Sequence, residues 1–301
     1  MAFDWAKAFE EEREHLFAVA YRMLGSATEA DDVLQDAWLR VRDTDEIPRS
    51  ARAMLTTVVV RLCLDELKSA RARRETYVGP WLPEPIAGSG VPAGERDDTP
   101  ETAFGLRESV SMGLLVVLES LSPLERAAFL LREAFDYDFA EIAVCLGRAE
   151  AACRQLHHRA RAHVEARHTR FHAKPEDAAR LATAFLAAVG SGDTNAVVSL
   201  LAADAVATSD GGGRVTAARK PIVGAERVAA FFLGVAKKAA SDITFTMGEA
   251  NGEFALFMHR AGHLFQVITV VADAEKIHRI HLVLNPEKLV RLERVLARPM
   301  A

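Results

Sequence analysis

The sequence has little cysteine, no apolar run long enough to span a membrane, and no overall positive charge. Cys63, Cys145 and Cys153 form no CxxC pair, which argues against a disulfide framework or a zinc site. Each lies among apolar residues of helical pattern, so we expect small buried side chains and no redox chemistry. The N-terminus lacks the basic, apolar and small-residue order of a signal peptide, which predicts a cytoplasmic protein.

The formal net charge of -5 at pH 7 argues against a uniformly basic nucleic-acid binder, but the charge is unevenly distributed. Residues 1–46 contain twelve acidic and five basic residues. Residues 52–74 contain six basic and two acidic residues, and residues 154–174 contain six basic residues, one acidic residue and five histidines. Two basic segments far apart in the sequence favour two contacts along one polyanion.

The most informative segment is DFAEIAVCLGRAEAACRQLHHRARAHV, residues 138–164. Asp138 and Glu141 form a capping box for a short helix, and Gly147 provides a turn, so the pattern predicts a helix-turn-helix. The second helix has an apolar face and an exposed polar face that suits the DNA major groove. We expect contacts with base edges at Arg154, Gln155 and His158, and contacts with the phosphate backbone at Arg159 and Arg161. The alternative is an amphipathic helical hairpin with a solvated charged face.

Three helices are predicted before residue 76. The first runs from Asp4 as cap to Leu24, the second starts at the capping residue Ser26, and the third starts at Ser50. Residues 76–100 contain five prolines and four glycines, a composition typical of a linker. Ser122, Pro123 and Glu125 then predict another helix start.

The pattern changes after Pro175. Helices are predicted to Gly190, over 194–201 and over 225–240, and alternation typical of strands begins at Ile243. Asn251-Gly252 predicts a hairpin turn. A few helices packed on a curved antiparallel sheet form an α+β domain.

Residues 9–75 and 122–166 resemble regions 2 and 4 of extracytoplasmic-function sigma factors, the promoter-recognition subunits of bacterial RNA polymerase. The resemblance rests on AYRMLGSATEADDVLQDAWLRV, AMLTTVVVRLCLDELKSARARRE and LSPLERAAFLLREAFDYDFAEIAVCLGRAEAACRQLHHRARAHV, in that order. Residues 175–290 resemble the SnoaL-like extension, of the NTF2-like fold, that one sigma subgroup has. The short segments WLPEP, DGGGR and NPEKL support that subgroup. Arg214 and Glu287 stand where the subgroup more often has Lys and Asp, and Ala149 stands where a capping Ser is usual.

The resemblance implies a multidomain protein with two all-α sigma domains followed by an α+β NTF2-like domain. The expected divisions are region 2 at 1–76, a linker with WLPEP at 77–102, region 4 at 103–172, a SnoaL-like domain at 175–290 and a tail at 291–301. Core RNA polymerase and double-stranded promoter DNA are the implied partners, with no membrane and no cofactor. The implied function is promoter-specific transcription initiation, not catalysis.

The resemblance also implies roles for particular residues. Polymerase binding is assigned to the acid-rich helix through Asp32, Val33, Leu34, Gln35, Asp36 and Trp38. Phosphate contacts near the downstream promoter element are assigned to Arg61, Lys68, Arg71, Arg73 and Arg74. Without the resemblance, a solvated helix surface is the favoured interpretation of the acidic face.

The C-terminal domain has two interpretations. In the first it controls activity in cis, without strictly requiring a separate anti-sigma factor, through contacts of Trp81, Leu82, Pro83, Glu84, Pro85, Asp210, Gly211, Gly212, Gly213, Arg214, Asn285, Pro286, Glu287, Lys288 and Leu289. A small hydrophobic ligand in its cavity is a possible further partner. In the second it is a polyketide-cyclase-like or isomerase-like enzyme that uses Asp210, His259, His263 and His281. His168 and His172 have a metal-compatible spacing but no acidic or Cys ligand beside them, so no metal site is expected.

Overall fold

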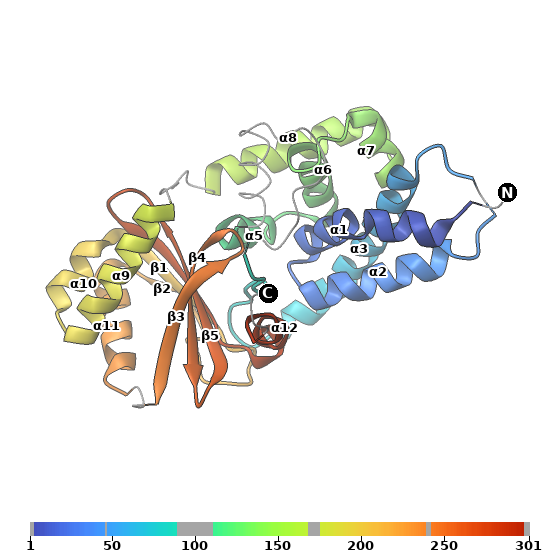
Figure 1. The fold of residues 1–301 in the computed structure, drawn as a ribbon. Helices are drawn as coiled ribbons and strands as arrows, with labels where there is room; N and C mark the ends of the chain where they lie inside the picture. The colour runs from blue at the N-terminus through green and yellow to red at the C-terminus, as the bar shows by residue number, and fades with distance from the viewer. Residues whose placement is uncertain (1–2, 46, 89–110, 168–174, 239–241, 298–301) are drawn as a thin grey trace. The chain divides into compact units, whose positions relative to one another are not determined.

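The computed structural model describes residues 3–45, 47–88, 111–167, 175–238 and 242–297 (Figure 1). Side chains are described for these residues except at 70–75, 167 and 175. The chain divides into two compact units. The first comprises Met1–Glu75 with Gly90–His168, and the second comprises Thr76–Ser89 with Thr169–Ala301. The first half of the expected linker is therefore part of the C-terminal unit.

Three helices form the beginning of the first unit, as the sequence predicts. Helix α1 spans Trp5–Leu24, where the Asp4 side chain accepts from the Lys7 amide and Gly25 ends the helix at a φ of 70°. Helix α2 spans Ala27–Val41 with Ser26 as its cap, and α3 spans Ala51–Glu75 after Ser50. Each helix buries one apolar stripe against the other two.

The remaining helices of the first unit are α5 (Met112–Leu118), α6 (Pro123–Glu133), α7 (Phe139–Leu146) and α8 (Glu150–Arg167). The capping boxes predicted at Ser122 and Asp138 are both present. Gly147 ends α7 at a φ of 60°, a left-handed conformation that glycine adopts without a Cβ penalty. The predicted helix-turn-helix is thus confirmed as α7 and α8.

Buried polar side chains join α1–α3 to α5–α8 within this unit. The Arg126 guanidinium donates to the carbonyls of Met23 at 2.7 Å and Leu118 at 2.9 Å. The Tyr137 hydroxyl donates to Thr56 Oγ1 at 2.9 Å. These bonds satisfy groups that would be costly to bury alone, so they fix the packing of the two helical groups.

The second unit contains a six-stranded sheet in the order β2-β1-β6-β5-β4-β3. Its strands are β1 (Leu201–Asp210), β2 (Ile222–Val223), β3 (Ile243–Ala250), β4 (Glu253–Arg260), β5 (His263–Ala272) and β6 (Ile277–Val283). Adjacent strands are antiparallel except β1 and β6, which are parallel. Asn251 and Gly252 join β3 to β4 with φ values of 56° and 71°, the conformation of a type I′ hairpin turn.

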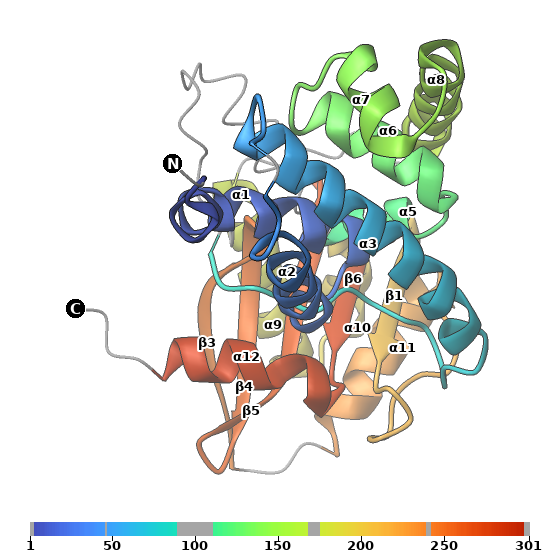
Figure 2. The same cartoon turned by 90° about the vertical axis from the view of Figure 1, so that its right-hand side faces the viewer.

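Helices α9 (Pro175–Ser191), α10 (Thr194–Leu200) and α11 (Ala225–Ala236) cover one face of the sheet, and α12 (Pro286–Leu296) lies on the other side (Figure 2). Alternate strand residues pack under α9–α11, among them Ala207, Leu256, Ile268 and Ile280. This arrangement confirms the α+β class expected for the C-terminal domain.

Three features of this unit differ from the sequence prediction. Strands β1 and β2 were not predicted, because the alanine-rich LAADAVATSD has weak strand propensity and follows a helix directly. The sheet is mixed rather than wholly antiparallel. Helix α12 runs to Leu296 and therefore includes the first residues of the segment expected to be a tail. Leu292, in that part of the helix, is buried.

Candidate functional site

The exposed face of α8 carries all five residues that the sequence assigned to DNA contacts, namely Arg154, Gln155, His158, Arg159 and Arg161. The Arg154 side chain is 58% exposed. His157 is turned inward, as its place on the helical wheel predicts, and lies 2.6 Å from Glu133 Oε1. The polar face of α8 is therefore accessible to a groove.

Glutamates hold three of these arginines in place. Arg154 pairs with Glu150 one turn earlier, and its guanidinium stacks over the Phe139 ring at 4.5 Å. Arg159 Nε lies 2.9 Å from Glu125 Oε1, and Arg161 Nε lies 2.9 Å from Glu165 Oε1. Exposed pairs of this kind contribute little stability, so phosphate or a base edge can replace the glutamate at small cost.

Helix α2 presents an acidic stripe formed by Asp32, Gln35, Asp36 and Leu39, at successive spacings of three, one and three residues. The first three are exposed, and Leu39 is 54% exposed. Leu39 is an exposed apolar residue that sequence reasoning did not single out, although its position three residues after Asp36 places it on the same face of the helix.

The other residues assigned to polymerase binding lie deeper. Val33 and Leu34 are only 6% and 2% exposed, and they pack in the core of the first unit. Trp38 is half-buried against Phe9, with ring centroids 5.6 Å apart. Val33 and Leu34 therefore position the helix and do not present surface to a partner.

The basic residues of α3 differ in their surroundings. Arg61 donates to the carbonyls of Val144 at 3.0 Å and Cys145 at 3.2 Å, so it caps the C-terminal end of α7. In this arrangement its guanidinium bonds protein carbonyls where a phosphate contact was expected. Lys68 is exposed and pairs with Asp65 at 2.8 Å. The side chains of Arg71, Arg73 and Arg74 lie outside the described residues.

In the second unit, Asp210 at the end of β1 is fully buried and joins the three short motifs. Its carboxylate accepts from the Tyr77 hydroxyl at 2.6 Å, the Leu82 amide at 2.8 Å and Lys288 Nζ at 2.7 Å. It also accepts from the Gly212 amide at 3.0 Å. We call this cluster of Tyr77, Leu82, Asp210, Asn285 and Lys288 the motif junction.

Lys288 and Asn285 complete the motif junction from the start of α12. Lys288 is 9% exposed, donates to the Leu82 carbonyl and lies 4.1 Å from the centroid of the Trp81 ring. The Asn285 side chain donates to the Tyr77 hydroxyl at 3.0 Å and caps α12 through the Glu287 amide at 3.1 Å. The Asp210 main-chain carbonyl accepts from the Leu284 and Asn285 amides. WLPEP, DGGGR and NPEKL, which are far apart in the sequence, are thus in contact.

The glycines of DGGGR allow this close approach. Gly212 has a φ of 59°, and a Cβ there would clash with the Asn285 side chain. Gly213 has a φ of 71°, and a Cβ there would lie 3.0 Å from Val78 Cβ. The next residue, Arg214, forms an exposed ion pair with Glu287 at 2.7 Å. Any other residue at either glycine would strain the backbone and push the motifs apart.

The rest of WLPEP continues along the C-terminal unit. Pro83, Glu84 and Pro85 are buried. The Ile86 amide donates to Asn251 Oδ1 at 3.2 Å, and the Asn251 amide donates to the Ile86 carbonyl at 3.0 Å. Residues 77–88 are therefore bonded both to the motif junction and to the β3–β4 turn.

The candidate catalytic groups are spread over several strands of the second unit. Two cavities are described in this unit, and neither is lined by Asp210, His259, His263 or His281. His263 Nδ1 lies 3.1 Å from Glu293 on α12. His259 and His281 alternate with residues that pack under α9–α11, so they point to the opposite face of the sheet. Burial, with a smaller effect of Arg279, lowers the pKa of His281 to about 4.

Two further expectations concern metals and membranes. His168 and His172 lie outside the described residues. Among the residues that the structure does describe, no three metal-ligating side chains form a group that could hold an ion. No helix in the described ranges is both long and apolar enough to cross a membrane.

Comparisons with known proteins agree with this arrangement. Residues 8–73 match the family Sigma-70 region 2, and residues 111–164 match the family Sigma-70, region 4. The chain is 42% identical over 231 residues to the ECF RNA polymerase sigma factor SigJ of Mycobacterium tuberculosis (strain ATCC 25618 / H37Rv), covering 76% of this chain and 72% of that protein. It is 30% identical over 291 residues to the probable ECF RNA polymerase sigma factor SigI of Mycobacterium tuberculosis (strain CDC 1551 / Oshkosh), covering 94% of this chain and 93% of that protein.

A solved structure is similar over nearly the whole chain. It is the crystal structure of the Mycobacterium tuberculosis extracytoplasmic function sigma factor SigJ, with a TM-score of 0.73 and 32% sequence identity. The match covers 94% of this chain and 98% of that one. The similarity therefore includes the C-terminal α+β domain as well as the two sigma regions.

Proposed function

The chain belongs to the ECF RNA polymerase sigma factors, which act in transcription initiation, and on that premise we propose that α8 reads the upstream promoter element while the C-terminal domain controls activity in cis. The observation that carries the first part is the exposed row of Arg154, Gln155 and His158 on the second helix of a helix-turn-helix. Arg reads guanine and Gln reads adenine through bidentate hydrogen bonds in the major groove.

Arg159 and Arg161 hold the phosphate backbone on either side of that row, and Lys68 with the basic end of α3 holds phosphates near the downstream element. Contacts to phosphate fix orientation and carry little sequence information. Arg61 becomes available for such a contact only when α7 moves away from α3, because its donors are bonded to α7 carbonyls.

The acidic stripe of α2, with Trp38 beside it, binds core RNA polymerase. Its carboxylates repel DNA phosphate and complement a basic protein surface, while Leu39 supplies apolar contact area. Val33 and Leu34 support the stripe from inside.

Base-specific reading is tested by replacing Arg154. The variant Arg154→Ala should lose about 1–3 kcal/mol of binding to the preferred promoter and relax specificity at one base pair. Binding is measured on DNA duplexes with each base pair of the upstream element varied in turn. The matched control Arg161→Ala should weaken binding to all duplexes alike. An equal loss on all duplexes with Arg154→Ala would contradict its assignment to a base.

Control in cis is supported by the motif junction. The connection between the two sigma regions passes through residues 77–88, and these residues are bonded to the C-terminal domain. The domain can therefore restrain how the two regions are spaced, and this restraint does not require a separate anti-sigma factor. Removing residues 286–301, which include Lys288, or all residues beyond 175 should change the transcript yield in a reconstituted assay. Unchanged yield with both truncations would contradict control in cis.

A further inference from the structure

Strand β3 is one of the two edges of the sheet, and its sequence lacks the features that usually protect an edge (Figure 2). It contains no lysine and no proline, and it pairs with β4 without a bulge. All residues from Thr244 to Glu249 are exposed. The other edge strand, β2, is only two residues long, and a short strand offers little to pair with. A regular, exposed edge such as β3 is a template for another strand.

Alternate residues of β3 direct their backbone groups away from β4. Because the two-residue turn Asn251-Gly252 joins the strands, Ala250 and every second residue before it form hydrogen bonds with β4. The residues between them direct their amide and carbonyl groups outward. They are Ile243, Phe245, Met247 and Glu249.

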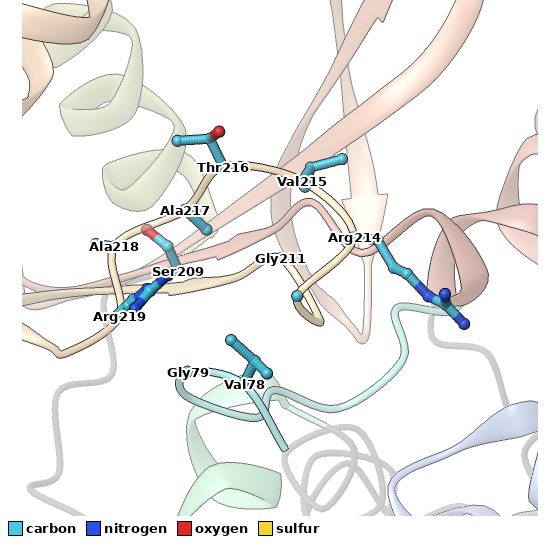
Figure 3. A pocket seen from close by; sticks show the side chains of 11 residues that line it. Val78, Gly79, Ser209, Gly211, Arg214, Val215, Thr216, Ala217, Ala218 and Arg219 are labelled. Atoms are coloured by element: carbon cyan, nitrogen blue, oxygen red, sulfur yellow. The ribbon is translucent and has the colours of Figure 1, made fainter. Parts of the chain in front are cut away.

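Residues 77–88 cover only the last of these outward-facing residues. The Gly88 amide donates to the Glu249 carbonyl at 2.9 Å, which also shows that this carbonyl points outward. The start of the same segment lies at the loop after β1, where Val78-Gly79 helps to line a cavity (Figure 3). No other hydrogen bond to the outward groups of β3 is found in the part of the chain that the structure describes. The free part of the edge therefore ends at Met247.

The side chains of this free edge are apolar on one face of the sheet and polar on the other. Ile243, Phe245 and Met247 share the face on which α9–α11 pack, because the residues opposite them on β4 belong to that core or pack against it. Phe245 and Met247 are nevertheless 51% and 48% exposed. Thr244 and Thr246 lie on the opposite face. The free edge thus has an apolar stripe, a stripe of threonines and no charged side chain.

We propose that β3 binds the β3 strand of a second copy of this chain, antiparallel, about a two-fold axis at Phe245. Phe245 is then opposite the partner's Phe245, and Ile243 is opposite the partner's Met247. On the other face, Thr244 is opposite the partner's Thr246. Each outward-facing pair exchanges both of its amide–carbonyl bonds. Apolar residues meet apolar residues and threonines meet threonines, which is the self-complementarity that a two-fold contact requires.

The position of the axis follows from the ends of the free edge. A shift of the partner by two residues in one direction brings the partner's Ile243 against Gly88, which already occupies the edge at Glu249. The same shift in the other direction leaves Met247 without a partner in the strand. Only the register centred on Phe245 pairs every free outward-facing residue.

Association is tested on the full-length chain by sedimentation at concentrations from about 1 to about 300 μM. A single pair of strands buries less surface than a standard interface, so we expect a weak, reversible dimer whose fraction rises through this range. Phe245→Lys places like charges directly opposite each other at the axis and should weaken association by roughly tenfold or more. The matched control Val223→Lys introduces the same charge at a valine that is also 51% exposed, on the other edge of the sheet, and should leave association unchanged. A monomer throughout the range, or equal weakening by both variants, overturns the proposal.

A mixture of two variants tests the position of the axis. Phe245→Lys and Phe245→Glu should each associate poorly alone, because each places its own charge opposite an identical charge. In an equimolar mixture lysine lies opposite glutamate, so the mixed dimer should form severalfold more tightly than either variant with itself. Equal association in the mixture and in the separate variants overturns the register, and this comparison does not depend on the stability of either variant relative to the unchanged chain.

Hydrogen exchange of the unchanged chain identifies what covers the edge. The amides of Ile243, Phe245 and Met247 should exchange rapidly in dilute solution and slowly as the dimer forms. The amides of Thr244 and Thr246 bond to β4 and should exchange slowly at every concentration. Slow exchange of the first three in dilute solution would mean that the chain covers its own edge, and a dimer without this slowing would mean that the copies meet elsewhere. Either result overturns the proposal, and neither affects the proposed function of α8, because no DNA is present.

Discussion

Replacing Lys288 by methionine tests whether the motif junction holds residues 77–88 in place. Methionine keeps most of the apolar stem that packs on Trp81, but it removes the ammonium group 2.7 Å from the Asp210 carboxylate. Asp210 is fully buried, so the variant leaves an anion without its counter-charge. Removing one partner of a buried pair typically costs about 3–5 kcal/mol.

Three other donors to Asp210 remain, from Tyr77, Leu82 and Gly212, which places the expected cost near the lower end, at about 3 kcal/mol. Hydrogen exchange of the Leu82 amide measures this directly, because that amide donates to the Asp210 carboxylate. A loss of about 3 kcal/mol in the free energy of local opening corresponds to roughly hundredfold faster exchange.

The matched control is Arg214→Gln, which removes a cation from the neighbouring Arg214–Glu287 pair. Both side chains of that pair are more than 60% exposed. The control should therefore change the free energy of local opening at the Leu82 amide by less than about 1 kcal/mol. The double variant Asp210→Asn with Lys288→Met should cost less than the sum of its single changes, because no charge is then left buried. If Lys288→Met alters exchange no more than Arg214→Gln does, the junction is not what holds this segment.

Two further predictions concern stability. Ala149→Ser should stabilise the start of α8 by about 1 kcal/mol, because Ala149 occupies the capping position before Glu150 and its methyl group cannot accept a hydrogen bond from a backbone amide. Thermal unfolding measures this gain. An unchanged unfolding midpoint would contradict the prediction. His281 has a pKa lowered from 6.5 to about 4 by burial, so between these values the unfolded chain binds a proton that the folded chain does not. The unfolding free energy should therefore fall by up to about 3 kcal/mol as pH drops through this window. Chemical denaturation across pH should show a flatter dependence in His281→Gln, and identical slopes in both proteins would refute this contribution.

The sequence predicted most of the first unit because its signals are local. A capping residue, a periodic apolar stripe and a terminating glycine each act over a few residues of the chain. The predicted caps Asp4, Ser122 and Asp138 and the terminating Gly147 are all found in the structure. The exposed face of α8 could be predicted for the same reason. Helical periodicity alone decides which side of α8 the core covers.

Features that depend on distant partners could not be predicted in the same way. Strand β1 is stabilised by parallel pairing with β6, about seventy residues later, and its alanines give little sign of it. The role of Arg61 at the end of α7 depends on a contact across 84 residues of sequence. The resemblance indicated that WLPEP, DGGGR and NPEKL act together, but only the structure identifies Asp210 as the group that bonds to all three.

The most direct test of control by the C-terminal domain is run-off transcription with core RNA polymerase and a cognate promoter, comparing the full-length chain with Lys288→Met and Arg214→Gln. The proposal predicts that Lys288→Met changes transcript yield severalfold while Arg214→Gln matches the unchanged chain. Equal yields from all three, with Leu82 exchange accelerated in Lys288→Met, would contradict it, because the segment would then be released without consequence for initiation.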